Sequence, residues 1–565
     1  MRRSHRAQGL TVRAIAGTHT VLLGLDLADP AGSLGFAIHR VDHTEGECTW
    51  LRAMKTFPSV VPDPAPGSDW STRDHPVQGF QWGDYSAKPG HDYTYTVSSL
   101  GGPPAAPVVL ASSAVRVSTE VEDDGVHGVW FNRGVAGSQA FARRFGGWLP
   151  GADPDESDPA MVWLSRGLAE AFLAFVARAT DADWSLHGAF YELTWDAGLS
   201  ALADARDRGA EVRLVVHGRD RDSTPDVNDD RTAEAAHAAV ARTGTEDLVI
   251  WRDVANRSAL HHHKFLVLAH HGDPVAVWTG STNLTRGALY GHSNVGHLVH
   301  HREVAGAYRA EWQRLVDGET TQDLRVVHDE PPLATPVPAD PGVTVVMSPR
   351  SSLAALHWYA DLVDAATSSA HLTGAFGLNK VFRDVLAVDR DLVRTVLLDK
   401  VPPPGQRIPL TDPDVRLSTG SHLSAGSLEQ WAAERLTGFN THVRYIHTKI
   451  IMIDPLTDDP TLLTGSANYS DASTFSNEEN TLVIRTGSTL ASSGRAVRRV
   501  ADIYLTEYHR LFMHHVFRAM AARQDVNSGA AHWTGHLDET DAWSARYYAP
   551  GSWRERQRRL FAGTG

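Results

Sequence analysis

The chain has 565 residues, a length that predicts about three or four domains. Hydrophobic residues make up 42% of the chain and charged residues 21%, which is enough for packed cores and excludes wholesale disorder. The net charge of −14 excludes a protein that coats nucleic acid through its average electrostatic field, so any polyanion must be held by a local basic site.

Cys48 is the single cysteine, which excludes a disulfide scaffold and a cysteine-based zinc module. No run of residues approaches the ~18–20 apolar residues of a membrane-spanning helix. Arg13 and His19 interrupt the N-terminal apolar segment, so we expect two strands there instead of a signal sequence. These features predict a cytoplasmic protein without an integral membrane segment.

Residues 1–118 show short apolar or alternating runs separated by Gly, Pro, Asp and Ser, which predicts a small all-β sandwich. The expected strands include residues 21–27, 34–39, 80–82, 93–97 and 114–117. The segment 89–97 resembles the turn and late strand of fibronectin-III or immunoglobulin-like domains, with Tyr93, Tyr95 and Val97 alternating toward the core. We expect this ladder to serve packing, not chemistry.

From about residue 119 the pattern changes to helices that alternate with strands. Residues 165–179 have apolar positions at helical spacing. Short apolar runs of strand length follow at 212–216, 248–251, 264–268 and 275–278. Interleaved strands and helices predict an α/β sheet that is buried on both faces.

An internal repeat divides the rest of the chain. Leu-His-Gly-Ala-Phe at 186–190 recurs as Leu-Thr-Gly-Ala-Phe at 372–376, a displacement of 186 residues. His-His-Lys at 262–264 recurs as His-Thr-Lys at 447–449, and Gly-Ser-Thr-Asn at 280–283 recurs as Gly-Ser-Ala-Asn at 465–468, both displaced by 185. The repeat predicts two duplicated α/β halves.

The expected domains are therefore a β sandwich (1–118), a first half (119–329), a Pro-rich linker (330–342), a second half (343–520) and an aromatic and basic C-terminal tail (521–565). We expect the aromatic residues of this tail to pack back onto the catalytic part of the chain. The basic run 554–559 is either a solvated helix face or a surface that steers nucleic acid.

Each copy of the repeat carries the residue types that a phosphodiester requires. A lysine donates to phosphate oxygens, an asparagine adds a neutral donor, a glycine lets the backbone approach closely, and a histidine moves a proton near neutral pH. The candidate catalytic residues are His262, Lys264, His447 and Lys449, and the candidate substrate-binding residues are Asn283, Asn468, Ser281 and Ser466.

On these residues the chain resembles the phospholipase D superfamily, whose paired motif is His-x-Lys-x4-Asp followed by Gly-Ser-x-Asn. The resemblance covers about residues 119–520. The second copy is complete, with Asp454, and continues into an Asn-x-Glu element at 477–479 that ends at Glu479. The first copy has Ala269 and Asn294 at the positions of Asp454 and Glu479. We expect Asp454, Gly280, Gly465 and Asn294 to give structural support.

The resemblance implies two halves related by pseudo-two-fold symmetry, a phosphohistidine intermediate, and no metal or other cofactor. We expect Glu479 to lie beside His447 and to favour a protonated general acid there. His262, with no matching acid, would then stay neutral as the nucleophile. The tyrosyl-DNA phosphodiesterases are similar, since their first motif also lacks the aspartate. The reverse assignment of the two histidines stays open.

A competing interpretation is a metal site formed by the histidines at 261–263 together with His270 and His271. It is disfavoured because Asp, Glu and Cys partners at zinc spacings are absent. The acidic residues between Asp220 and Asp230 lack the pattern of a calcium loop, so a solvated loop is expected.

The predicted activity is that of a metal-independent phosphodiesterase, a hydrolase for which nucleic acid (DNA or RNA) is the favoured substrate. A phospholipase D-type lipid phosphodiesterase is the alternative enzyme. A catalytically inactive phosphate-binding pseudoenzyme is the alternative of another class. Because both motifs lie in one chain, a monomer can hold a complete active site, and the oligomeric state stays open.

Overall fold

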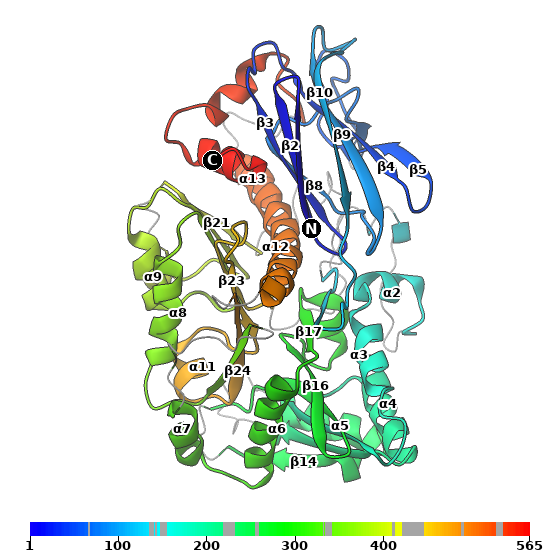
Figure 1. The fold of residues 1–565 in the computed structure, drawn as a ribbon, viewed down its shortest axis with the longest axis vertical. Coiled ribbons are helices and arrows are strands. Elements are labelled where there is room, and N and C mark those ends of the chain that lie inside the picture. Colours follow the sequence, from blue (N-terminus) through cyan, green and yellow to red (C-terminus); the bar gives the residue numbers. More distant parts are fainter. Residues whose placement is uncertain are drawn as a thin grey trace.

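Three parts make up the molecule: a β domain at one end and two α/β halves side by side at the other (Figure 1). The computed structural model describes residues 1–65, 68–134, 141, 144–146, 155–218, 232–254, 259–330, 333, 342–408, 413–420, 446–486, 491–526 and 535–565. The acidic loop at 220–230 and most of the linker at 330–342 lie outside these residues.

The N-terminal domain is a sandwich of two four-stranded antiparallel sheets, as the sequence predicts. One sheet has the order β1 (Arg2–Ala7), β2 (Leu10–Ala16), β3 (Val21–Leu27) and β8 (Gln81–Asp84). The other has the order β10 (Val108–Ser118), β9 (Asp92–Gly101), β4 (Gly35–Asp42) and β5 (Glu47–Trp50). The short strands β6 (Arg52–Ala53) and β7 (Trp70–Ser71) pair separately. Tyr93, Tyr95 and Val97 are buried in the core.

The first half is built on a seven-stranded mixed sheet. Its order is β11 (His127–Phe131), β17 (Val295–Val299), β16 (Asp273–Gly280), β15 (Lys264–His270), β12 (Trp184–Phe190), β13 (Glu211–His217) and β14 (Val249–Arg252). Its helices are α2 (Pro159–Ser165), α3 (Leu168–Val176), α4 (Asp196–Asp207), α5 (Thr232–Thr243), α6 (Arg302–Val316) and α7 (Thr321–Asp329), with short turns η1 (Glu246–Leu248) and η2 (Gly287–Gly291).

The second half repeats this sheet strand for strand, which confirms the predicted duplication. Its order is β18 (Val343–Ser348), β24 (Glu479–Arg485), β23 (Thr461–Gly465), β22 (Ile450–Ile453), β19 (Ser369–Gly374), β20 (Val393–Leu398) and β21 (Val415–Thr419). Its helices are α8 (Ala354–Asp364), α9 (Lys380–Ala387), α11 (Asp471–Phe475) and the long α12 (Ala491–Val526), with the turn η3 (Pro404–Gln406).

The register of the first repeated strand differs from the sequence match. Leu186 pairs with Leu268 in the first half, so a displacement of 186 would pair Leu372 with Ile453. Leu372 pairs instead with Ile451. When the two sheets are matched by their strand pairing, residues of β12 correspond to residues of β19 that lie 184 positions later. The two similar Gly-Ala-Phe sequences therefore occupy positions in the sheets that differ by two residues.

The helix predicted over 165–179 is present as α3, which runs from Leu168 to Val176 and is shorter than predicted. Helix α2 ends at Ser165 and α3 begins at Leu168, because Arg166 and Gly167 both adopt positive φ (50° and 88°). This left-handed pair ends one helix and starts the next. No single helix in the described ranges is long and apolar enough to cross a membrane; by length and composition alone, the α2–α3 pair, bent by 83°, passes as a broken span.

Both sheets are buried on both faces, as the alternation of strands and helices predicts. Their inner faces share one core, in which Val267 and Val277 of the first half join Met452 and Leu482 of the second. Helices α3, α4 and α5 cover the outer face of the first sheet, and α8 and α9 cover that of the second. Helix α12 runs between the halves and up to the sandwich (Figure 1).

The C-terminal segment packs on the β sandwich and also on the second half, where the sequence analysis expected it: residues 553–562 contact β20, and Arg556 pairs with Asp391 and Asp414. Within η4 (Asp541–Tyr547), Trp543 stacks on Phe80 at 5.4 Å between ring centroids and donates its Nε1–H to the carbonyl of Ser33 at 2.8 Å. Helix α13 (Trp553–Ala562) lies against β3 (Figure 1). The expectation holds for Phe561, which joins the core of the two halves, and is wrong for Trp543, because an aromatic residue indicates burial but not the surface that buries it. Helix α13 also contains the basic run, in which Arg556 and Arg558 form ion pairs.

Candidate active site

The two His-x-Lys segments lie at the ends of equivalent strands, and each one is held by the other half. The backbone N–H of His262 donates to the carbonyl of Glu478 at 2.9 Å, and that of His447 donates to the carbonyl of Ser293 at 3.2 Å. Both pairs of equivalent residues are 185 apart in the sequence. These reciprocal hydrogen bonds bring the two histidines to the junction of the halves.

Each lysine is anchored to the segment that carries its own histidine. The ammonium of Lys264 donates to the carbonyl of His262 at 2.9 Å, and that of Lys449 donates to the carbonyl of His447 at 2.6 Å. Both lysines are buried, and β15 and β22 begin at or directly after them. This local hydrogen bond fixes one donor of each ammonium group and leaves two others for a ligand.

Glu479 lies beside His262, at 3.2 Å from its Nδ1, and not beside His447 as the sequence analysis expected. The cause is the exchange of segments between halves: the turn before β24 crosses to the first half, where Glu478 also pairs with His261. The spacing of the motif gives the position of Glu479 in the chain. It does not show that the turn before β24 packs against the first half.

His447 has an amide partner in place of a carboxylate. Its Nδ1 lies 2.8 Å from Oδ1 of Asn294, an oxygen that also accepts a hydrogen bond from the Ser281 hydroxyl at 2.8 Å. The amide nitrogen of Asn294 donates to the carbonyl of Ala288, which fixes the orientation of the amide. Because Oδ1 only accepts, His447 carries its proton on Nδ1 and has Nε2 available. Asn294 thus orients a histidine, beyond the structural support expected of it.

The same two lysines affect the pKa values of both histidines. The pKa of His262 is held well below its ordinary value, first by burial and then by the charges of Lys264 and Lys449. Burial and the same two lysines also hold the pKa of His447 well below its ordinary value, together with His292 and His262. Both lysines therefore act on both imidazoles, although they come from different halves.

Burial also shifts the pKa values of the two lysines and of Glu479. Burial lowers the pKa of Lys264 to about 7 and lowers that of Lys449 well below its ordinary value. Burial also raises the pKa of Glu479 to about 8, against the opposing hydrogen bond from Asn477. Without a bound anion, each of these groups is therefore shifted toward its neutral form.

The Gly-Ser pairs support the strands that follow them. A Cβ on Gly280 would lie 2.3 Å from the carbonyl oxygen of Val295, and one on Gly465 would lie 2.4 Å from that of Asn480. The hydroxyl of Ser281 accepts a hydrogen bond from the Val295 N–H, and that of Ser466 accepts one from the Asn480 N–H. Both serines are fully buried. In the structure they hold the motif together, and their expected contact with substrate stays a prediction.

The two motif asparagines differ in their surroundings. Asn283 donates its amide N–H to the carboxylate of Glu192, which sequence analysis did not identify. The Oδ1 atoms of Asn283 and Asn468 are buried and have no hydrogen-bond partner within the described ranges. Glu192 also raises the pKa of both lysines, although burial dominates their shifts. It follows β12 at the register position that Phe376 occupies after β19, so no repeated motif marked it.

Aromatic rings and a further pair of supports surround the histidines. Tyr191 lies 5.0 Å from His262 and His292 lies 5.9 Å from His447 between ring centroids. Behind each motif, a side chain at the end of the neighbouring strand accepts a backbone N–H: His217 from His261 at 3.4 Å, and Asp399 from Ile446 at 2.9 Å. The sequence contains no repeated residue type that would have indicated this second pair.

Asp454 lies at the opposite end of the sheet from the histidines. Its carboxylate accepts hydrogen bonds from the backbone and hydroxyl groups of Thr367 and Ser368 and from the backbone of Ser369, at 2.7–2.9 Å. It ties the loop before β19 to the turn after β22. This contact makes it a structural support, and it lies away from the phosphate-binding groups.

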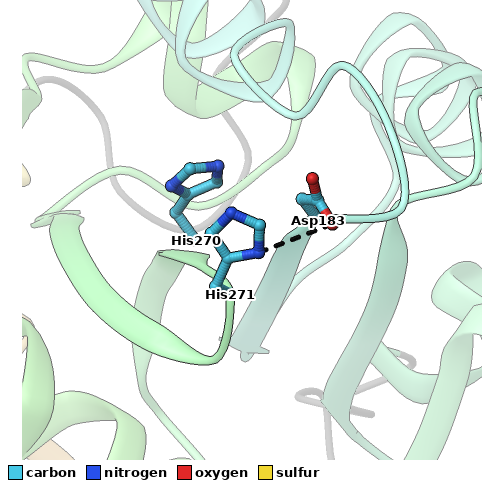
Figure 2. Close-up of side chains that lie close together, drawn as sticks. All are labelled: Asp183, His270 and His271. Atoms are coloured by element: carbon cyan, nitrogen blue, oxygen red, sulfur yellow. Dashed lines mark ion pairs between the residues drawn. The ribbon is translucent and has the colours of Figure 1, made fainter.

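The histidines at 261–263 and those at 270 and 271 lie in separate places in the structure. His261 lies 2.7 Å from Glu478, and His263 lies 3.5 Å from Glu311, both fully buried. His270 and His271 stand at the far end of β15 (Figure 2). The five histidines therefore do not form the single metal site considered from the sequence.

The fold and site define a duplicated α/β protein with a histidine, lysine and asparagine from each half at a shared junction. Residues 175–316 match the family model described as "Cardiolipin synthase, PLD-like domain". The match runs from the last turn of α3 to the end of α6 and agrees with the resemblance found in the sequence. The comparison with curated proteins gave no match.

Three solved structures illustrate the likeness. Phosphatidylserine synthase from Haemophilus influenzae Rd KW20 is 13% identical over 60% of this chain and 84% of that one, with a TM-score of 0.40. The phospholipase D family member Nuc from Salmonella typhimurium is 22% identical over 26% and 88%, with a TM-score of 0.21. Polyphosphate kinase from Porphyromonas gingivalis is 11% identical over 62% and 49%, with a TM-score of 0.35, so this chain spans about half of that kinase.

Proposed function

We propose that the protein is a metal-independent phosphodiesterase that works through a phosphohistidine intermediate and acts on nucleic acid. The observation that carries this proposal is the reciprocal pairing at the junction, where each half supplies one buried histidine, lysine and asparagine. An anion between the two lysines would reverse the effect of burial and restore their charges. Those charges would then neutralise the phosphate without a metal ion.

In the first step, Nε2 of His262 attacks phosphorus, and the bond to the leaving oxygen breaks. His447, protonated when the anion is bound, gives its Nε2 proton to that oxygen. In the second step a water attacks phosphorus, His447 takes the proton of that water, and the P–N bond to His262 breaks. Glu479 favours His262 as the nucleophile, because phosphorylation of the ring at Nε2 places a positive charge beside this carboxylate.

Two exposed side chains near the site support nucleic acid as the substrate class. Phe376 follows β19 on the edge that carries the pocket, and 63% of its surface is exposed. Lys400 is exposed and directly follows Asp399, the support of the second motif. An exposed ring that stacks on bases, with a cation for the backbone, is the usual combination for single-stranded nucleic acid. A phospholipid substrate is the second candidate, since the matched family model is described by cardiolipin synthase.

A substrate panel tests the proposal. Single- and double-stranded DNA, RNA, phosphatidylcholine vesicles and bis-p-nitrophenyl phosphate are assayed with and without EDTA, with His262→Ala as the blank. We expect cleavage of nucleic acid that EDTA leaves unchanged and that His262→Ala abolishes. Phe376→Ala should weaken binding to single strands while leaving bis-p-nitrophenyl phosphate cleavage within about twofold, because stacking contributes ~1–3 kcal/mol per base.

Three other results would contradict parts of this proposal. Release of headgroup from vesicles without cleavage of DNA or RNA would replace the substrate class by phospholipid. Loss of activity in EDTA with recovery on added zinc would overturn the metal-independent chemistry. Equal inertness of the wild type and of His262→Ala and His447→Ala on every phosphodiester would identify a phosphate-binding pseudoenzyme.

A further inference from the structure

A second group of histidines lies at the far end of β15, away from the phosphate pocket. His270 ends this strand, His271 begins the turn to β16, and Asp183 precedes β12 (Figure 2). One ring nitrogen of each histidine and one carboxylate oxygen of Asp183 all lie within 4.8 Å of one another. Strand β15 has seven residues, with Lys264 at one end and His270 at the other, a length of about 20 Å.

The backbone under these three residues is held by hydrogen bonds. Trp184 pairs with His270 in the sheet, and the backbone N–H of His271 donates to the carbonyl of Asp183 at 2.7 Å. His271 and Gly272 both have positive φ (49° and 83°), which is the geometry of a tight two-residue hairpin turn. The positions of the three Cα atoms are thus fixed, while 63% of the His271 side chain and 61% of the Asp183 side chain are exposed and free to adjust.

The equivalent place in the second half explains what this group can do. There Asp454 accepts five hydrogen bonds and ties the loop before β19 to the hairpin. The first half has Ala269 at that position, which accepts none with its side chain. Among the described residues, the side-chain link between the corresponding loop and hairpin is the 3.5 Å contact of His271 with Asp183.

We propose that Asp183, His270 and His271 bind a divalent transition metal ion of the zinc class, which ties the loop to the hairpin as Asp454 does in the other half. Two imidazoles and one carboxylate suit Zn²⁺, with water as the fourth ligand. Tetrahedral binding at ~2.0–2.1 Å brings ligand atoms to about 3.3 Å from one another. The ligand atoms here lie within 4.8 Å of one another, and His271 already lies 3.5 Å from Asp183, so only a small adjustment of exposed side chains is needed. The site is structural and does not depend on the proposed phosphodiesterase activity.

A comparable group in the β sandwich is already satisfied by protein contacts. Asp42, Glu45 and His91 also bring their ligand atoms within 4.8 Å. Asp42 pairs with His91 at 2.9 Å and accepts backbone N–H groups, and Glu45 pairs with Lys88. A cation there would have to displace these partners, whereas the carboxylate of Asp183 has no hydrogen-bond donor within the described ranges.

The test is a titration of the full chain, stripped with EDTA and dialysed, with ZnCl₂ in a calorimeter. We expect one equivalent of Zn²⁺ per chain in the wild type and in the matched control His91→Ala. His270→Ala and Asp183→Asn should each weaken binding at least tenfold, and Co²⁺ should give the visible absorption of a tetrahedral site in the wild type and in His91→Ala but not in these two variants. Thermal unfolding in EDTA checks that the variants remain folded.

Absence of stoichiometric binding to the stripped wild type would overturn the proposal. So would binding that persists unchanged in the double variant His270→Ala/His271→Gly, or binding that is lost in His262→Ala but kept in His270→Ala. Cleavage of phosphodiesters by zinc-free protein is measured in the same samples. Its failure would contradict the metal-independent function, but not the zinc site, so the two proposals fail separately.

Discussion

At the scale of single residues, the site is symmetric in position and asymmetric in charge. Glu479 contacts His262, and its equivalent Asn294 contacts His447. Both partners lie at Nδ1 and leave Nε2 available, so both rings are oriented in the same way. Only His262 has a carboxylate that stabilises a positive ring, and phosphorylation creates such a ring. The difference between the two partners therefore assigns the nucleophile.

This assignment predicts where a covalent intermediate accumulates. With bis-p-nitrophenyl phosphate, whose leaving group needs no proton, His447→Ala should form the adduct on His262 and hydrolyse it slowly, because the base for water is missing. Rapid acid-free quenching and mass spectrometry of peptides locate the phosphoryl group. His262→Ala serves as the control and should show no adduct. A phosphoryl group found on His447 would reverse the roles.

The raised pKa of Glu479 predicts that this side chain lowers the stability of the protein at neutral pH while it supports activity. Burial raises its pKa to about 8, from 4.5. The folded protein then retains a proton that the unfolded chain releases above pH 4.5, so stability is full below that pH and falls as the pH rises toward 8. Glu479→Gln removes this dependence and should raise the free energy of unfolding at pH 7 by about 2–3 kcal/mol, while turnover falls at least tenfold.

Denaturant unfolding at several pH values measures this effect. The difference between Glu479→Gln and the wild type should grow from near zero at pH 4.5 to its largest value above pH 7. Asp384→Asn, at an exposed ion pair of α9, is the control and should show no such growth. A glutamine variant that is less stable than the wild type at pH 7 would contradict the assigned shift.

At the scale of elements, the repeat predicted some features and left others open. The motif spacing of 185 holds for His262 with His447 and for Gly280 with Gly465, because the hairpin between these positions keeps its register. The apolar run 21–27 coincides with β3. Apolar periodicity indicates burial within a strand, and most residues of these strands are buried.

Other features of the fold and site correspond to no apolar pattern and no repeated motif in the sequence. Strand β1 is a polar edge strand with mostly exposed side chains, so its sequence has no apolar alternation. Glu192 takes part in the site through Asn283, but its register equivalent is Phe376, so the repeat does not mark it. The crossing of the turn before β24 to the other half depends on long-range packing. Because of these tertiary contacts, Glu479 contacts His262 and Asn294 contacts His447, although the motifs alone suggest the opposite pairing.

The hairpin strands that end at Gly280 and Gly465 require glycine. Their φ angles are +129° and +151°, and an added Cβ would meet a backbone carbonyl of the next strand. Gly280→Ala and Gly465→Ala should each lower the free energy of unfolding by about 2–4 kcal/mol, through strain and overpacking. Gly306→Ala, in α6 with open space around it, is the control and should stabilise by up to about 1 kcal/mol.

Equilibrium unfolding in urea compares the three glycine variants. A loss in Gly280→Ala as small as the change in Gly306→Ala would mean that the strand shifts to accept the methyl group. Activity provides a second measure, since a shift of β16 moves Asn283. We expect activity to fall in Gly280→Ala at a temperature where the variant is still folded.

At the scale of the whole molecule, one buried ion pair joins parts that are distant in sequence. Glu507 of α12 pairs with Arg166, in the turn between α2 and α3, at 2.5 Å, and both side chains are at most 2% exposed. Glu507 also pairs with Arg510 at 2.8 Å and accepts the hydroxyl of Thr20 in the β sandwich at 3.2 Å. The helix that runs between the halves thereby links the sandwich to the first half.

This linkage predicts that the sandwich and the first half lose stability together. Glu507→Gln leaves the guanidinium of Arg166 buried without its counter-charge, which should lower the free energy of unfolding at pH 7 by about 3–5 kcal/mol. Arg166 and Arg510 lower the pKa of Glu507 to about 2, so its contribution is present above pH 4.5 and is lost as the pH falls toward 2. The variant should therefore approach the wild type in acid. Hydrogen exchange of β3 and α3 measures both parts at once: faster exchange in both would follow from the linkage, whereas faster exchange in one alone would show that α12 does not couple them.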